Sequence, residues 1–152
     1  MKNKLYICLF GSGKTYFCQK YPEWVDFDVG CVGFAASNAV YQNYLSKLPA
    51  NIVLNVSPRA VHLVTNYQLA DVSRIIVVLP EKEMKQEIIN RCLNRPDHDK
   101  WFETYLVQNY DKVYEIAESL PFPKIYLKSG QFLTDIINRD GTVKRGIEIK
   151  EA

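Results

Sequence analysis

The chain lacks the features that mark several specialised classes of protein. Its four cysteines form no CxxC pair and no cluster with metal-ligand spacing. We therefore expect buried thiols in a reduced compartment, not a disulfide framework or a zinc site. No apolar run approaches the ~20 residues that a membrane-spanning helix needs. Only a short apolar stretch, residues 5–10, follows the basic start, so we expect no secretory signal. These absences predict a cytoplasmic protein with no membrane partner.

The net charge of the chain is small, and no linker or repeat divides it. Nineteen Lys and Arg against seventeen Asp and Glu leave a formal charge of +2, which does not by itself indicate nucleic-acid binding. There is no internal repeat, and the seven glycines and seven prolines are spread along the chain without forming a linker. A length of 152 residues fits one domain. We expect that domain over residues 1–137, followed by a C-terminal tail or hairpin over residues 138–152.

The chain does contain a regular alternation of strand and helix patterns. Short apolar or β-branched runs predict strands over residues 5–9, 24–27, 52–56, 74–79 and 124–127. Helical spacing of apolar residues predicts helices over residues 14–21, 35–48, 58–69, 80–93, 102–120 and 132–137. Strands that alternate with helices favour right-handed crossovers and a parallel sheet. The expected fold is a three-layer α/β domain.

A glycine-rich loop follows the first expected strand directly. The sequence Gly11-Ser12-Gly13-Lys14-Thr15 matches the end of the G-x-x-x-x-G-K-[ST] motif, whereas Cys8 stands at the position of its first glycine. Backbone N–H groups of such a loop cradle phosphate oxygens, and the following helix N-terminus adds positive potential. Lys14 would then bridge the terminal phosphates of ATP, and Thr15 would offer its hydroxyl to Mg²⁺. The alternative is a glycine turn that binds nothing.

With these residues the chain resembles the small P-loop kinases, the branch that holds nucleoside monophosphate kinases and shikimate- or gluconate-type kinases. It looks most like the compact kinase-like P-loop proteins often encoded by bacteriophages. The resemblance runs over residues 5–137. It implies a three-layer α/β/α P-loop NTPase with a five-stranded parallel sheet of strand order 2-3-1-4-5 and a short helical lid. It also implies ATP and Mg²⁺ as cofactors.

The resemblance points next to two acids at the end of the second expected strand. Asp26 and Asp28 lie two residues apart, so they share one face of an extended strand. In kinases of this kind, acids here meet Mg²⁺ or an acceptor hydroxyl. The resemblance therefore implies that Asp28 shares the metal with Thr15, and that Asp26 or Asp28 orients or deprotonates the acceptor. Two solvated loop acids are the alternative.

Three arginines complete the site that the resemblance implies. Arg91 and Arg95 lie four residues apart on one helix face, where lid arginines clamp the transferring phosphoryl group. The alternative is a pair of surface arginines that bind acids such as Glu87 and Asp97. Arg59, after the third expected strand, would hold an acidic acceptor, or it starts a helix and binds no ligand.

Two functions stay open on this evidence. The first is a phosphotransferase that moves the γ-phosphoryl group of MgATP to a small acceptor, a nucleotide or nucleoside. The second is a non-catalytic nucleotide-binding protein that regulates or docks on a protein partner, or on a second copy of itself. The second is favoured by Cys8 and by the lack of a Walker B aspartate after the third or fourth expected strand. A nucleic-acid-linked ATPase is disfavoured by the short length and small net charge.

Overall fold

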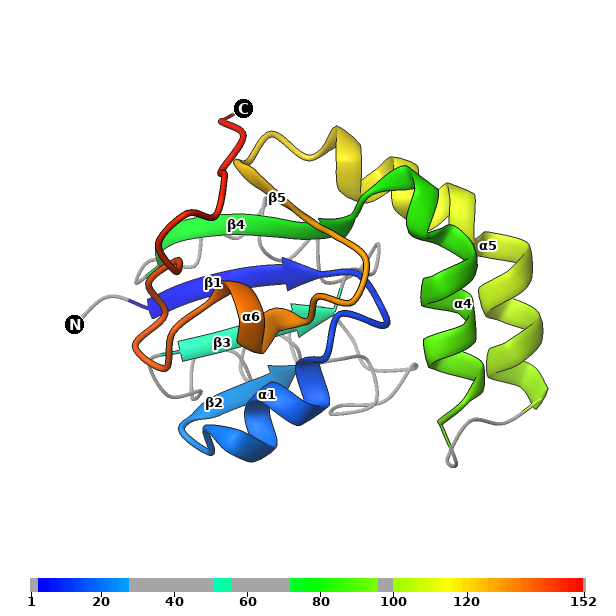
Figure 1. The fold of residues 1–152 in the computed structure, drawn as a ribbon, viewed down its shortest axis with the longest axis horizontal. Helices are drawn as coiled ribbons and strands as arrows, with labels where there is room; N and C mark the ends of the chain where they lie inside the picture. The colour runs from blue at the N-terminus through cyan, green and yellow to red at the C-terminus, as the bar shows by residue number, and fades with distance from the viewer. Residues whose placement is uncertain (1–2, 28–50, 56–71, 96–99, 152) are drawn as a thin grey trace, which may run out of the picture.

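A parallel sheet forms the centre of the molecule (Figure 1). The computed structural model of the chain describes residues 3–27, 51–55, 72–95 and 100–151. Its strands are β1 (Asn3–Cys8), β2 (Trp24–Phe27), β3 (Asn51–Asn55), β4 (Val72–Pro80) and β5 (Lys124–Leu127). Every neighbouring pair is parallel, in the order β2-β3-β1-β4-β5. The carboxyl ends of the strands therefore meet at one edge, where ligands bind in folds of this kind.

The described helices are four α-helices and one short 3₁₀ turn. They are α1 (Lys14–Lys20), the 3₁₀ turn η2 (Lys82–Met84), α4 (Lys85–Leu93), α5 (Lys100–Ser119) and α6 (Leu133–Ile136). Helix α1 contacts β2 and α6, whereas α4 packs against α5 at the side of the sheet (Figure 1). Helix α5 also contacts β4. The loop between β1 and α1 thus lies between two helical groups.

The fold class predicted from the sequence needs correction. The structure describes a small α/β fold in which β2, β3 and β1 form an all-parallel group and β4 and β5 continue the sheet on the other side of β1. Helix α4, predicted to belong to a short lid, is part of the core instead, because Ile88 and Cys92 are 0% exposed. The helices predicted over residues 35–48 and 58–69, on which the three-layer prediction depends, lie outside the described residues. A three-layer P-loop NTPase with a lid is therefore withdrawn in favour of the small α/β fold.

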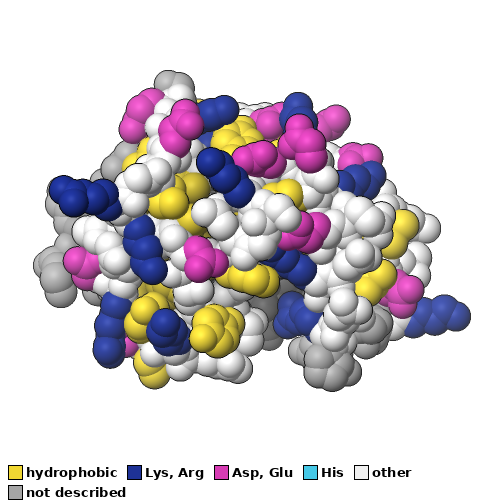
Figure 2. Space-filling model, in the orientation of Figure 1, with side chains coloured by type: hydrophobic (Ala, Val, Ile, Leu, Met, Phe, Trp, Pro, Cys, Tyr) yellow, Lys and Arg dark blue, Asp and Glu magenta, His cyan; other side chains and the backbone are white. Residues whose placement is uncertain are grey.

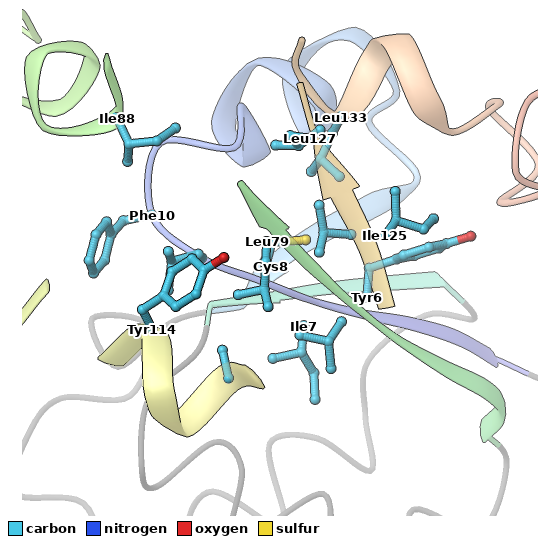
Figure 3. Packing of buried hydrophobic residues seen from close by; sticks show 14 of the residues in the cluster. Tyr6, Ile7, Cys8, Phe10, Leu79, Ile88, Tyr114, Ile125, Leu127 and Leu133 are labelled. Atoms are coloured by element: carbon cyan, nitrogen blue, oxygen red, sulfur yellow. The ribbon is translucent and has the colours of Figure 1, made fainter. Parts of the chain in front are cut away.

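A cluster of buried hydrophobic side chains joins the described strands to the described helices. Figure 3 shows its side chains coming from β1, β4 and β5 on one hand and from α4, α5 and α6 on the other. In β1, Leu5 and Cys8 are 0% exposed, as expected for the central strand of a parallel sheet that is covered on both faces. Leu9 and Phe10 continue this burial beyond the strand. The start of the glycine-rich loop is therefore anchored in the core.

The C-terminal segment after α6 is packed on the sheet. Its backbone forms isolated bridges between Ile137 and Val143 and between Lys124 and Lys150. The Tyr6 hydroxyl donates to the Gly141 carbonyl at 2.6 Å, and the Trp24 indole donates to the Arg139 carbonyl at 2.8 Å. Residues 138–150 thus connect β1 and β2 to the edge strand β5.

The buried hydroxyl of Tyr110 gives a first prediction. Tyr110 lies in α5, is 3% exposed, and its hydroxyl has no hydrogen-bond partner in the part of the chain that the structure describes. Burial raises the pKa of Tyr110 to about 12. Above the ordinary tyrosine pKa of about 10 the unfolded chain loses this proton and the folded chain keeps it, so the free energy of unfolding falls between those two values.

Tyr110→Phe is expected to raise the free energy of unfolding by up to about 1 kcal/mol at pH 7, because it removes an unpaired buried hydroxyl. The gain should be larger at pH 11, because folding of the wild-type chain then also has to keep Tyr110 protonated at a pH where the unfolded chain loses this proton. Urea unfolding at both pH values measures this. Tyr16→Phe, at a side chain that is 59% exposed, is the matched control. A loss of stability on Tyr110→Phe at pH 7 would show that the hydroxyl has a partner.

Candidate functional site

The residues 11–15, below called the GSGKT loop, connect β1 to α1. Gly11 and Gly13 have φ angles of 77° and 90°, in the left-handed region that favours glycine. A Cβ atom on Gly11 would lie 2.9 Å from Ile88 Cγ2, and one on Gly13 would lie 3.1 Å from Phe132 Cδ1. Both glycines are therefore required by backbone conformation and by close packing against α4 and the segment before α6.

Three successive carbonyls of this loop are anchored to the rest of the protein. Gly11 O accepts from Arg91 Nη1 at 3.1 Å, Ser12 O from the Leu133 N–H at 2.9 Å, and Gly13 O from the Phe17 N–H at 3.0 Å. In a trans peptide the N–H points opposite to the C=O. The N–H groups of residues 12–14 are thus directed away from these partners, and no described residue accepts a hydrogen bond from them. Unpaired N–H groups in succession are what an anion-binding loop offers.

A hollow of about 420 Å³ lies beside the loop. It is lined by Gly11, Gly13, Lys14, Thr15, Tyr16, Gln19, Arg91, Arg95 and Phe132. Three of these side chains are cationic and none is acidic, whereas both signs of charge are interspersed over the face shown in Figure 2. The Lys14 ammonium group makes no hydrogen bond or ion pair with the described residues. The hollow therefore has the polarity of an anion site.

Arg91 lies at the hollow, but most of its donors are already engaged. Its side chain is 14% exposed, and Nη2 lies 2.7 Å from Glu87 Oε2. Nη1 donates to the Gly11 carbonyl at 3.1 Å and to the Gln131 carbonyl at 3.0 Å. Its guanidinium also lies over the Phe132 ring, 4.0 Å from the centroid. The pairing with Glu87, which was the alternative to a lid role, is present, and Arg91 also anchors the Gly11 carbonyl at the edge of the hollow that it lines.

Arg95 remains the exposed arginine of the predicted pair. It lines the same hollow from the end of α4, and its backbone N–H donates to the Cys92 carbonyl at 3.4 Å. Lys14, Thr15, Arg91 and Arg95 thus line one hollow. Thr15 is exposed on the first turn of α1.

The remaining predicted site residues are not placed by the structure. Asp26 lies in β2, opposite Val53 of β3, but its side chain is outside the description. Asp28 and Arg59 lie outside the described residues altogether. Within residues 3–27, 51–55, 72–95 and 100–151 there is no group of three or more His, Cys, Asp or Glu side chains that could hold a metal ion.

Sequence reasoning missed the segment before α6, residues 129–132. Ser129 Oγ donates to Glu87 Oε1 at 2.5 Å, and the Gly130 N–H donates to Glu87 Oε2 at 2.9 Å. Phe132 packs against Gly13. The i, i+4 spacing of Glu87 and Arg91 indicated one contact of this group, but no local pattern ties residue 87 to residue 129.

The cysteines fit the expectation of buried thiols where they are described. Cys8 and Cys92 are buried, whereas Cys18 is half-buried. Burial raises the pKa of the Cys92 thiol, although the positive charges of Lys14, Arg95 and Arg91 oppose this shift. Cys92 therefore stays protonated at neutral pH and serves as packing next to the loop.

A larger hollow of about 650 Å³ lies between β5, α5 and the C-terminal segment. Its lining carries charges of both signs, among them Glu81, Glu118 and Lys82. Several of these groups already bind one another, since Lys82 Nζ lies 3.6 Å from Glu118 Oε1 and the Tyr126 hydroxyl donates to Glu118 Oε2 at 3.3 Å. We place the candidate site at the GSGKT loop because three successive unpaired backbone donors lie there beside a hollow lined by three cations and no acid.

No protein-family model and no curated protein sequence matches the chain. Among the described helices, none is long and apolar enough to cross a membrane.

Proposed function

We propose that the GSGKT loop binds the phosphates of ATP, and that the protein transfers the γ-phosphoryl group to a small acceptor, a nucleotide or nucleoside. The observation that carries this proposal is the row of unpaired N–H groups at residues 12–14 beside the Lys14 ammonium group. Backbone donors and a lysine in this arrangement stabilise the β- and γ-phosphates of a nucleotide.

Each described residue then has a role. The backbone of residues 11–14 and Lys14 hold the triphosphate, and Thr15 offers its hydroxyl to Mg²⁺, which neutralises charge on the phosphates. Asp28 would be the second metal ligand, and Asp26 or Asp28 would orient the acceptor hydroxyl, with Arg59 holding an acidic acceptor. We assign Arg95 to the transferring group because its side chain is exposed at the hollow, whereas the Arg91 side chain is only 14% exposed.

A second candidate function is nucleotide binding without transfer, in a regulatory protein that docks on a protein partner or a second copy. One observation favours it. Strand β3 ends beside β1, with Asn55 in register with Cys8. A Walker B acid would be expected at this end of the strand, where this chain has the amide side chain of Asn55. We place either function in the cytoplasm, where free thiols, ATP and Mg²⁺ occur together.

The test is ADP formation from MgATP, screened against nucleoside monophosphates, deoxynucleosides and small hydroxy acids. We expect ADP that depends on one acceptor class and is absent with Lys14→Ala. Arg95→Ala should lower turnover about 100-fold while changing ATP affinity less than three-fold, because a transition-state clamp acts on the chemical step. Loss of ATP affinity with intact turnover would contradict the role of Arg95. MgATP binding with no ADP across the whole screen would support the second function.

A further inference from the structure

We infer that Glu87 is a positioning residue for the phosphate site, acting through Arg91 on the GSGKT loop. This inference rests on the proposed function and extends it to a residue that touches neither the loop nor the hollow. Glu87 lies in the first turn of α4, and the loop is 76 residues earlier in the chain at Gly11. The connection is made by hydrogen bonds at both ends of the Arg91 guanidinium group.

The two carboxylate oxygens of Glu87 bind two different segments. Oε2 accepts from Arg91 Nη2 at 2.7 Å and from the Gly130 N–H at 2.9 Å, and Oε1 accepts from Ser129 Oγ at 2.5 Å. These bonds hold the pKa of Glu87 below its ordinary value, with the Ser129 hydrogen bond as the largest cause. The carboxylate is therefore ionised at neutral pH and joins α4 to the segment before α6.

Arg91 connects Glu87 to the GSGKT loop by hydrogen bonds. With Nη2 held by Glu87, its Nη1 bridges the carbonyls of Gly11 and Gln131. The bond to Gly11 O fixes the peptide plane between residues 11 and 12, whose N–H is the first of the three unpaired donors. A loop whose donors are fixed before the ligand arrives loses less conformational freedom on binding.

The segment bound by Glu87 also supports the second loop glycine. Phe132 follows residues 129–131 and lies against Gly13, while the Arg91 guanidinium packs on its ring at 4.0 Å from the centroid. The Leu133 N–H then donates to the Ser12 carbonyl at 2.9 Å. Glu87 thus orients two consecutive loop peptides, one through Arg91 and one through the start of α6.

The test is MgATP binding by calorimetry to the full chain and its variants. We expect Glu87→Ala to weaken binding about ten-fold, the effect of losing one charge-assisted hydrogen-bond group. Glu115→Ala, at an exposed glutamate of α5, should bind like the wild type. Because Glu87 acts in part through Arg91, the double variant Glu87→Ala/Arg91→Ala should lose less affinity than the sum of the two single losses. Millimolar guanidinium ion should partly restore binding to Arg91→Ala and not to Lys14→Ala.

The outcomes separate the two proposals. If Lys14→Ala binds MgATP like the wild type, the phosphate site is elsewhere and both proposals fail. If Lys14→Ala loses binding while Glu87→Ala keeps it, the proposed function stands and the positioning role of Glu87 is wrong. Additive losses in the double variant would likewise overturn that role, since a purely structural effect does not act through Arg91. Glu87→Gln, which keeps the side-chain shape, replaces Glu87→Ala in every comparison if the alanine variant does not fold.

Discussion

Lys14→Ala is expected to weaken MgATP binding by about 100-fold or more while leaving the fold intact. The Lys14 ammonium group lines the hollow with the loop backbone and makes no hydrogen bond or ion pair with the described residues, so its removal leaves no broken contact among them. In the complex it would bind two phosphate oxygens, and each charge-assisted hydrogen bond contributes about 1.5–3 kcal/mol. Calorimetric titration with MgATP measures the loss, and thermal unfolding followed by circular dichroism measures the fold.

Lys20→Ala is the matched control for this experiment. Lys20 is an exposed lysine in the last turn of the same helix, α1, with its Nζ 5.5 Å from the centre of the Tyr21 ring. The two variants remove the same charge from the same helix. Equal weakening by both would indicate a general charge effect, and unchanged binding in a folded Lys14→Ala protein would remove the phosphate-loop proposal.

The strands were the most predictable part of the fold. The pattern placed β2 and β5 at residues 24–27 and 124–127, the bounds that the structure has. For β1 the prediction of residues 5–9 differs from Asn3–Cys8, because Leu9 stays buried beyond the strand and keeps the apolar run going. The bounds of these strands could be predicted because each strand is a short apolar run between polar turns, a pattern that depends only on neighbouring residues.

The lid was predicted wrongly for a physical reason. Helical spacing shows that Met84, Ile88 and Cys92 share a face, but not what covers that face. The structure buries it against Gly11 and the core, where a glycine leaves room for Ile88. Because α4 is then fixed, Arg91 serves the loop and is not carried by a separate lid.

Within the candidate site, sequence reasoning found the residues whose neighbours are local. Residues 11–15 are contiguous, and their chemistry follows from composition and order. The contact between Arg91 and Gly11 spans 80 residues, and that between Glu87 and Ser129 spans 42. Such contacts depend on how α4 and β5 are placed around the sheet. A single sequence gives spacing along an element but not the pairing of distant side chains.

Gly11→Ala is expected to lower the free energy of unfolding by about 3 kcal/mol. A φ of 77° costs an alanine about 1 kcal/mol or slightly more. The added Cβ would also lie 2.9 Å from Ile88 Cγ2 and 3.5 Å from the Ile88 carbonyl oxygen. Since Ile88 is 0% exposed, the side chain has little room to move, and overpacking of this kind costs about 1–3 kcal/mol. Urea unfolding at pH 7 measures the sum.

Two comparisons separate backbone strain from the close contact. Gly146 has a φ of 86° with nothing within 4 Å of an added Cβ, so Gly146→Ala should show the strain alone, about 1 kcal/mol. Leucine has no Cγ2 branch, so Gly11→Ala should cost less in an Ile88→Leu background than in the wild type, by about the overpacking energy of ~1–2 kcal/mol. If Gly11→Ala and Gly146→Ala destabilise equally, α4 does not press on the loop. That result would contradict a role for α4 in shaping the site, because we attribute the hydrogen bond from Arg91 to the Gly11 carbonyl to the close approach of Ile88 to Gly11.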